Sequence, residues 1–169
     1  MFYERELRFL RETFNKCRVR TCVLSPEDKF MKDSDELVSN AAILIPTLSS
    51  GIIETAGKID NNTIYKFTDD FGSSYTFLRL PEAPYENILL IGPYLSAPMS
   101  AQQILEIGEK KGIAPKSQKI LEDYYLNLPI LAESSHLFLM LDTFCERIWG
   151  SPYIRWLIFA ATAPHRHPL

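Results

Sequence analysis

The sequence predicts a single α+β domain, and three observations lead to that class. A chain of 169 residues with 46% hydrophobic and 23% charged residues has the size and composition of one ordinary globular domain. Between residues 63 and 91, runs of β-forming residues are separated by turn residues. From about residue 100 to residue 150, apolar residues instead recur at helical spacing. We therefore expect a sheet flanked by helices, with a helical C-terminal half.

The first 60 residues contain one clear helix and less certain segments after it. The apolar residues that recur at helical spacing in residues 2–16 are Tyr3, Leu7, Leu10 and Phe14. The stretch from Cys17 to Leu24 alternates and is rich in β-formers, which predicts a strand. The apolar residues from Leu37 to Ile45 fit a second helix. It is expected to end or kink there, because Pro46 cannot continue it. Residues 48–59 fit either a strand or a helix.

A hairpin and a central strand follow. Thr63–Thr68 and Ser73–Leu80 are predicted strands, joined by a turn over Asp69–Gly72. The paired acids Asp69 and Asp70 are interpreted as turn residues rather than as a catalytic pair, since Asp is common before glycine in turns. The apolar run Asn87–Ile91 predicts a strand covered on both faces, ending at Gly92-Pro93.

The next two helices have well-marked ends. Ser100 and Gln103 form a predicted capping box, with Met99 and Ile104 as a hydrophobic staple. Gly112 suits the position just after this helix. The second helix is predicted from about Pro115 to Leu126. The residues that it is expected to bury before Pro129 are Ile120, Leu121, Tyr124 and Leu128.

The third helix begins near Ser134 or Ser135 and ends at Gly150. It carries two apolar lines: Leu137, Met140, Leu141, Phe144 and Ile148 form one, and Phe138, Cys145 and Trp149 form the other. Two interpretations stay open. In the first, the helix packs between the sheet and neighbouring helices, which bury both lines. In the second, the second line faces a partner subunit, which covers it because an exposed apolar line is unfavourable in water. Residues 1–150 are thus expected to form the domain, and 151–169 an irregular tail or linker.

Composition and motifs argue against several function classes. The net charge of -3 does not favour nucleic-acid binding by these residues. No membrane-spanning apolar stretch and no signal peptide are predicted. The three cysteines cannot all pair and do not have the spacing of a disulfide framework, which favours a cytoplasmic location. The only histidines are His136, His165 and His167, and no nucleophile, phosphate-loop or zinc pattern accompanies them. We therefore expect no catalytic residues, no metal and no cofactor. A small enzyme is therefore the least favoured of the function hypotheses.

One strand carries a candidate binding site. Tyr75, Phe77 and Arg79 share one face of the predicted strand by its period of two. An aromatic surface with one guanidinium group is typical of a site that orients an anionic small molecule. The alternative is that the two rings belong to the core and that Arg79 extends to water.

Several segments of this chain resemble a known family. Thr63–Asp69, Phe71-Gly72, Tyr75–Pro81 and Leu90–Leu95, followed by Asp123–Tyr125 and Phe144–Gly150, are similar to the N-terminal regulatory domain of AraC-type transcriptional regulators from Firmicutes. The resemblance covers roughly residues 1–150. It implies a PAS- or GAF-like fold, with a central antiparallel sheet flanked by helices.

The resemblance also implies a function. The domain would sense a small-molecule effector, form a homodimer, and relay the signal through helix 134–150. DNA would be bound only by a C-terminal half of two helix-turn-helix units, which these residues do not include. A protein interaction module without a ligand is the alternative from a different class.

Overall fold

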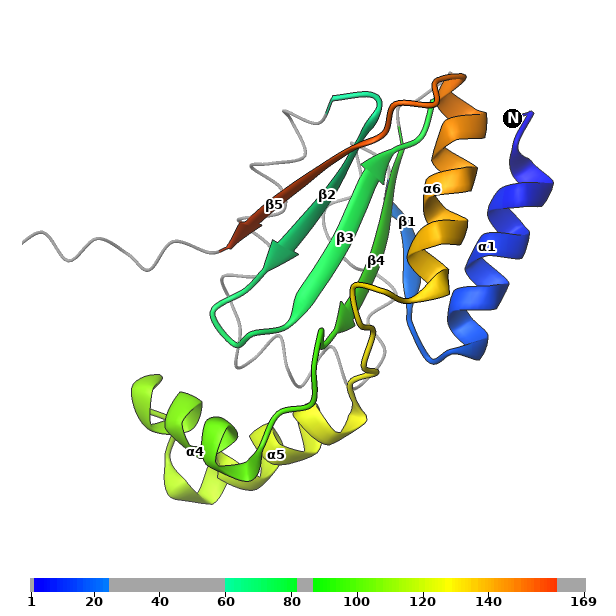
Figure 1. Ribbon diagram of the computed structural model, residues 1–169. Coiled ribbons are helices and arrows are strands. Elements are labelled where there is room, and N and C mark those ends of the chain that lie inside the picture. The colour runs from blue at the N-terminus through cyan, green and yellow to red at the C-terminus, as the bar shows by residue number, and fades with distance from the viewer. Residues whose placement is uncertain (1, 25–59, 82–86, 161–169) are drawn as a thin grey trace, which may run out of the picture.

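The computed structural model describes residues 2–24, 60–81 and 87–160. Five strands form one mixed sheet in the order β1-β4-β3-β2-β5 (Figure 1). Their bounds are Thr21–Leu24 for β1, Thr63–Thr68 for β2, Ser74–Arg79 for β3, Ile88–Tyr94 for β4 and Arg155–Ala160 for β5. The first four strands pair antiparallel, whereas β5 runs parallel to β2. The predicted α+β class is confirmed, but the expectation of a purely antiparallel sheet is wrong at β5.

The helices in the described residues occupy two places. Helix α1 (Glu4–Lys16) and helix α6 (His136–Trp149) lie side by side on one face of the sheet (Figure 1). Helix α4 (Ala101–Lys110), the 3₁₀ turn η1 (Pro115–Ser117) and helix α5 (Gln118–Asn127) lie beyond one end of the strands. The molecule therefore has a helix-covered sheet face and a separate helical lobe at the sheet's end.

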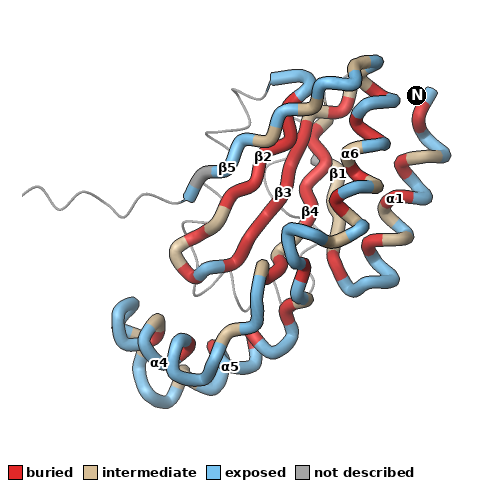
Figure 2. The backbone as a smooth tube through the Cα atoms, viewed as in Figure 1, coloured by how far each residue is buried: buried red, intermediate tan, exposed pale blue. Residues whose placement is uncertain are grey.

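The main core fills the space between the sheet and the α1–α6 pair. Figure 2 shows that the central strands are buried along most of their length. The core residues contributed by strands include Ile64, Leu78, Leu89 and Ile91, and those contributed by the two helices include Leu7, Leu10, Phe14, Leu141 and Phe144. The periodic pattern of α1 thus has the role that the sequence predicts, since an amphipathic helix buries its apolar stripe.

Both apolar lines of α6 pack inside this chain. The Phe138 ring lies 5.9 Å from the Tyr94 ring and 5.6 Å from the Trp156 ring, between centroids. Cys145 is fully buried, and Trp149 is half-buried against the same core. The burial supports the interpretation that α6 packs between the sheet and α1. The expected partner-facing line of Phe138, Cys145 and Trp149 is not exposed.

The predicted helix ends are mostly confirmed. Ser100 Oγ accepts a hydrogen bond from the Gln103 amide at 3.2 Å, and the Gln103 side chain accepts one from the Ser100 amide at 2.8 Å. Helix α6 begins after Ser135, whose side chain caps it, and ends at Gly150 with a φ of 63°. A glycine is favoured there because L-residues rarely adopt positive φ.

Other predictions need correction. The strand expected over Cys17–Leu24 forms only from Thr21, because the chain first turns away from α1. Strand β4 does not end at Gly92-Pro93 but continues to Tyr94. Ile120 is exposed rather than buried. The predicted helix at 37–45 and the segment 48–59 lie outside the described residues.

The expected irregular tail is also wrong in part. Residues Arg155–Ala160 form strand β5, which pairs with all of β2 from Thr63 to Thr68. The run Trp156–Ala160 is apolar and suits a strand, but each residue pairs with one that lies 92 positions earlier in the sequence. Local patterns carry no record of such a long-range pairing.

Candidate ligand-binding site

Two of the three predicted site residues on β3 are buried aromatic side chains. Tyr75 and Phe77 are buried on the sheet face opposite α1 and α6, and the Phe77 ring stacks on Tyr65 with centroids 5.2 Å apart. Arg79 is half-buried near the end of the strand. The two rings therefore pack as core residues, the alternative that the sequence left open. None of the three lines the pocket described below.

Tyr75 nevertheless leads to a buried polar cluster at the other end of β3. Its phenol interacts with that of Tyr124 of α5. The Tyr124 hydroxyl also shares a hydrogen bond of 2.8 Å with Ser73 Oγ. Burial raises the pKa of Tyr124 to about 12. These phenols thus stay protonated near neutral pH and connect the helical lobe to the sheet.

Asp69 organises the turn beside this cluster. Its Oδ1 accepts hydrogen bonds from the main-chain amides of Phe71 and Ser73, each at 2.9 Å. This geometry confirms its predicted role as a turn residue. Its Oδ2 is buried and has no hydrogen-bond partner among the residues that the structure describes. Burial raises the pKa of Asp69 to about 6, against the opposing effect of the two amide hydrogen bonds.

Three contacts hold the same hairpin against the helical lobe. The Tyr125 hydroxyl donates a hydrogen bond to the Phe71 carbonyl. Lys111 Nζ lies 2.8 Å from Asp70 Oδ2 and 5.3 Å from the centre of the Phe71 ring. The hairpin and the lobe are therefore joined by a buried hydrogen bond, an ion pair and a cation–π contact.

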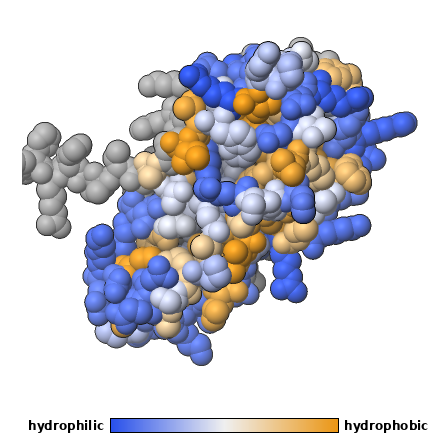
Figure 3. Space-filling model, in the orientation of Figure 1, coloured by the Kyte–Doolittle hydropathy of each residue, from blue (hydrophilic) through white to orange (hydrophobic). Residues whose placement is uncertain are grey.

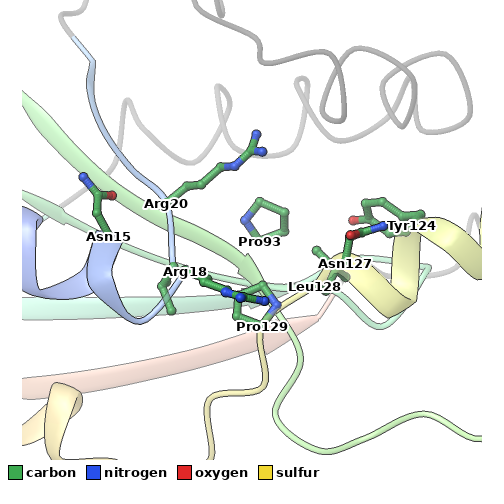
Figure 4. Close-up of a pocket in the computed structure, with 9 residues that line it drawn as sticks. Asn15, Arg18, Arg20, Pro93, Tyr124, Asn127, Leu128 and Pro129 are labelled. Carbon is green, nitrogen blue, oxygen red and sulfur yellow. The ribbon is translucent and has the colours of Figure 1, made fainter.

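A pocket of about 340 Å³ opens next to this cluster (Figure 4). It is lined by Asn15, Arg18, Val19, Arg20, Pro93, Tyr124, Asn127, Leu128 and Pro129. Among the described lining residues there are two guanidinium groups and no carboxylate. The pocket's volume lies at the lower end of the range of small-molecule sites.

Backbone geometry places the two arginines there. After α1 the chain reverses at Arg18, which has a φ of 63°, and the Val19 amide donates to the Phe14 carbonyl at 2.9 Å. The Arg20 carbonyl then accepts a hydrogen bond of 2.9 Å from Gly92 of β4. Arg18 and Arg20 are not among the predicted site residues, because the sequence pattern places both on a strand. The one feature of the sequence that could have indicated this site is the pair of arginines on either side of Val19.

The pocket has the chemistry to hold an anion. Arginine side chains donate paired hydrogen bonds to carboxylates and phosphates. The amide side chains of Asn15 and Asn127 and the phenol of Tyr124 add neutral hydrogen-bonding groups. Because Tyr124 also belongs to the buried cluster, a bound molecule could contact a residue that reaches the sheet.

Comparison with known protein families, curated proteins and solved structures finds no match to this chain. No helix in residues 2–24, 60–81 and 87–160 is long and apolar enough to cross a membrane. Within the same residues, no group of three or more His, Cys, Asp or Glu side chains is arranged to hold a metal ion.

Proposed function

We propose that this chain is a signal-sensing domain of an AraC-type transcription regulator and that it binds a small anionic molecule in the pocket beside Arg18 and Tyr124. The observation that carries the proposal is the position of Tyr124. It lines a pocket with two arginines, is hydrogen-bonded to Ser73 just before β3, and interacts with the buried phenol of Tyr75 on β3. The family resemblance of the sequence supplies the regulator part of the proposal.

The signal leaves the pocket through β3 and α6. Tyr75 lies on β3, and the Arg79 carbonyl near the end of the same strand accepts a hydrogen bond from Trp149 at the end of α6. A change at Tyr124 can therefore bias the position of the α6 terminus through a rigid strand. In the proposed regulator, α6 passes this change to a dimer partner and to the DNA-binding half. The chain itself catalyses no reaction in this proposal.

Binding is tested by calorimetry with anionic probes. Inorganic phosphate, sugar phosphates and small dicarboxylates are titrated into the wild-type chain and into Arg18→Gln and Tyr124→Phe. Loss of one charged hydrogen-bond donor should weaken binding of the best probe about tenfold or more in Arg18→Gln. The control Lys119→Gln loses the same charge at an exposed position of α5 outside the pocket and should bind normally.

The relay has its own readout. The only tryptophans of the chain are Trp149 and Trp156. In the Trp156→Phe variant, fluorescence reports on Trp149 alone, at the far end of β3 from the pocket. Binding with an unchanged Trp149 spectrum would contradict the relay but not the site. Absence of binding by every anion would contradict the sensor proposal and favour an interaction module without a ligand.

A further inference from the structure

A second pocket, of about 290 Å³, lies where the beginning of α6 faces strands β2 and β5. Its charged lining residues are Lys66, Glu133 and Asp142, and its aromatic ones are Phe138 and Trp156. None of these residues lines the pocket beside Arg18. The two sites can therefore be tested independently.

Lys66 is the buried charge of this second pocket. Only 9% of the residue is exposed. Its Nζ donates to Ser96 Oγ at 2.9 Å and lies 3.7 Å from Glu133 Oε1, which is beyond hydrogen-bond distance. The Glu133 side chain is 79% exposed, so water weakens this ion pair. An ammonium group has three donors, and burial without enough acceptors is unfavourable. Lys66 can thus accommodate a further anionic oxygen from the pocket.

Asp142 supplies the opposite charge. Its Oδ1 accepts a hydrogen bond of 2.8 Å from the indole nitrogen of Trp156, which fixes the carboxylate at the pocket wall. No cation in the described part of the chain lies within ion-pair distance of Asp142. A carboxylate with one neutral donor keeps the capacity to bind an ammonium group.

The remaining wall is apolar. The Phe138 and Trp156 rings meet edge to face at 5.6 Å, with an interplanar angle of 88°. Leu139 and Ile158 line the same pocket and are 60% and 66% exposed. Figure 3 shows hydrophobic residues at the surface over β5 and α6. An apolar group placed here would cover exposed hydrophobic surface.

The charges together select the ligand class. Lys66 contributes +1 and Glu133 and Asp142 contribute -1 each, so the lining sums to -1. Asp142 disfavours a ligand that is only an anion, and Lys66 disfavours one that is only a cation. We propose that this pocket binds an apolar α-amino acid, with its carboxylate on Lys66, its ammonium group on Asp142 and its side chain against Phe138 and Trp156.

Three probes that share one apolar side chain and differ in their charged groups test the proposal by calorimetry on the full chain. L-leucine carries both charges, 4-methylpentanoate lacks the ammonium group, and 3-methylbutylamine lacks the carboxylate. Phenylalanine, 3-phenylpropionate and 2-phenylethylamine form a parallel set. Each amino acid should bind at least about tenfold more tightly than either of its analogues, since each analogue leaves one charged group of the pocket unmatched. An analogue that binds as tightly as its amino acid overturns the proposal, and so does a lack of binding by both sets.

Two substitutions separate the two charges. Asp142→Asn keeps an acceptor for Trp156 and should weaken amino-acid binding about tenfold, whereas the carboxylate analogue should bind more tightly because its repulsion by Asp142 is removed. Lys66→Met should weaken amino-acid binding similarly, whereas the amine analogue should bind more tightly because its repulsion by Lys66 is removed. Asp123→Asn, at an exposed position of α5, is the control and should change nothing. If Lys66→Met does not fold, Leu139→Trp at the exposed rim is used to obstruct the pocket. Unchanged leucine affinity in both Asp142→Asn and Leu139→Trp overturns the site.

Discussion

The indole nitrogen of Trp149 donates a hydrogen bond of 3.1 Å to the main-chain carbonyl of Arg79, 70 residues earlier in the chain. This contact ties the last residue of α6 to the last residue of β3. The sequence suggested separate roles for the two residues, one at a partner interface and one at a ligand site. In the folded chain they are joined instead.

Replacing Trp149 with Phe should therefore lower the free energy of unfolding by about 1 kcal/mol or somewhat more. The ring packing is largely retained, but the Arg79 carbonyl loses its donor. Urea denaturation measures the change. Tyr153→Phe is a control, because Tyr153 is 85% exposed and should contribute little. Equal stability of Trp149→Phe and wild type would show that the hydrogen bond contributes nothing.

The buried carboxyl of Asp69 predicts a specific pH dependence. Its pKa is about 6 in the folded chain, above its ordinary value of 3.8. Between these values the folded state holds a proton that the unfolded state has released. The free energy of unfolding should thus fall as pH rises from about 4 to about 6, by about 3 kcal/mol in all, and this contribution should be constant above that range.

Asp69→Asn tests this dependence, since it keeps an oxygen acceptor for the turn and removes the titration. Urea denaturation of both chains from pH 4 to pH 8 should show a shallower slope for the variant below pH 6. Asp123→Asn, at an exposed position, should retain the wild-type slope. Identical slopes for Asp69→Asn and wild type would contradict the shifted pKa.

Gly92 is predicted to tolerate no side chain. Its φ is 130°, and an added Cβ would lie 2.8 Å from the Ser74 carbonyl oxygen on the neighbouring strand. Gly92→Ala should therefore destabilise the chain by about 2 to 4 kcal/mol, through strain and crowding together. Gly112 also has a positive φ but has no atom within 4 Å of an added Cβ, so Gly112→Ala should cost only about 1 kcal/mol. Thermal denaturation of the two variants compares them, and equal losses would contradict the close contact.

The two cysteines at opposite extremes of exposure should react at very different rates. Cys145 is fully buried, and burial raises the pKa of its thiol, whereas Cys17 is exposed. Because the thiolate is the reactive form, iodoacetamide should label Cys17 quickly and Cys145 only when the chain unfolds. Mass spectrometry of peptides follows both sites over time. Comparable rates in the native protein would mean that Cys145 is accessible.

The proposed homodimer can be tested apart from the stability of the protomer. Phe138→Asp places a charge in the core and should cost about 3 kcal/mol or more, whatever the oligomeric state. Leu139→Asp changes the adjacent exposed residue of α6 and should leave stability nearly unchanged while weakening a dimer formed through this helix. Light scattering during size-exclusion chromatography measures the mass. A wild-type chain that stays monomeric at high concentration contradicts the dimer.

The sequence by itself determined the features that depend on near neighbours. The capping box of Ser100 and Gln103, the strand Thr63–Thr68, the turn at Asp69 and the apolar stripe of α1 all arise from contacts within a few residues. Such contacts leave a periodic or motif-like record in the chain.

Only the tertiary structure decided the pairings between distant segments. Strand β5 forms on β2, β4 continues through Pro93, and both apolar lines of α6 are buried within one chain. The two pockets likewise combine side chains from separate elements, such as Arg18 with Tyr124 and Lys66 with Asp142. Burial and charge pairing between remote residues depend on how the elements pack, and no local pattern in the sequence encodes that packing.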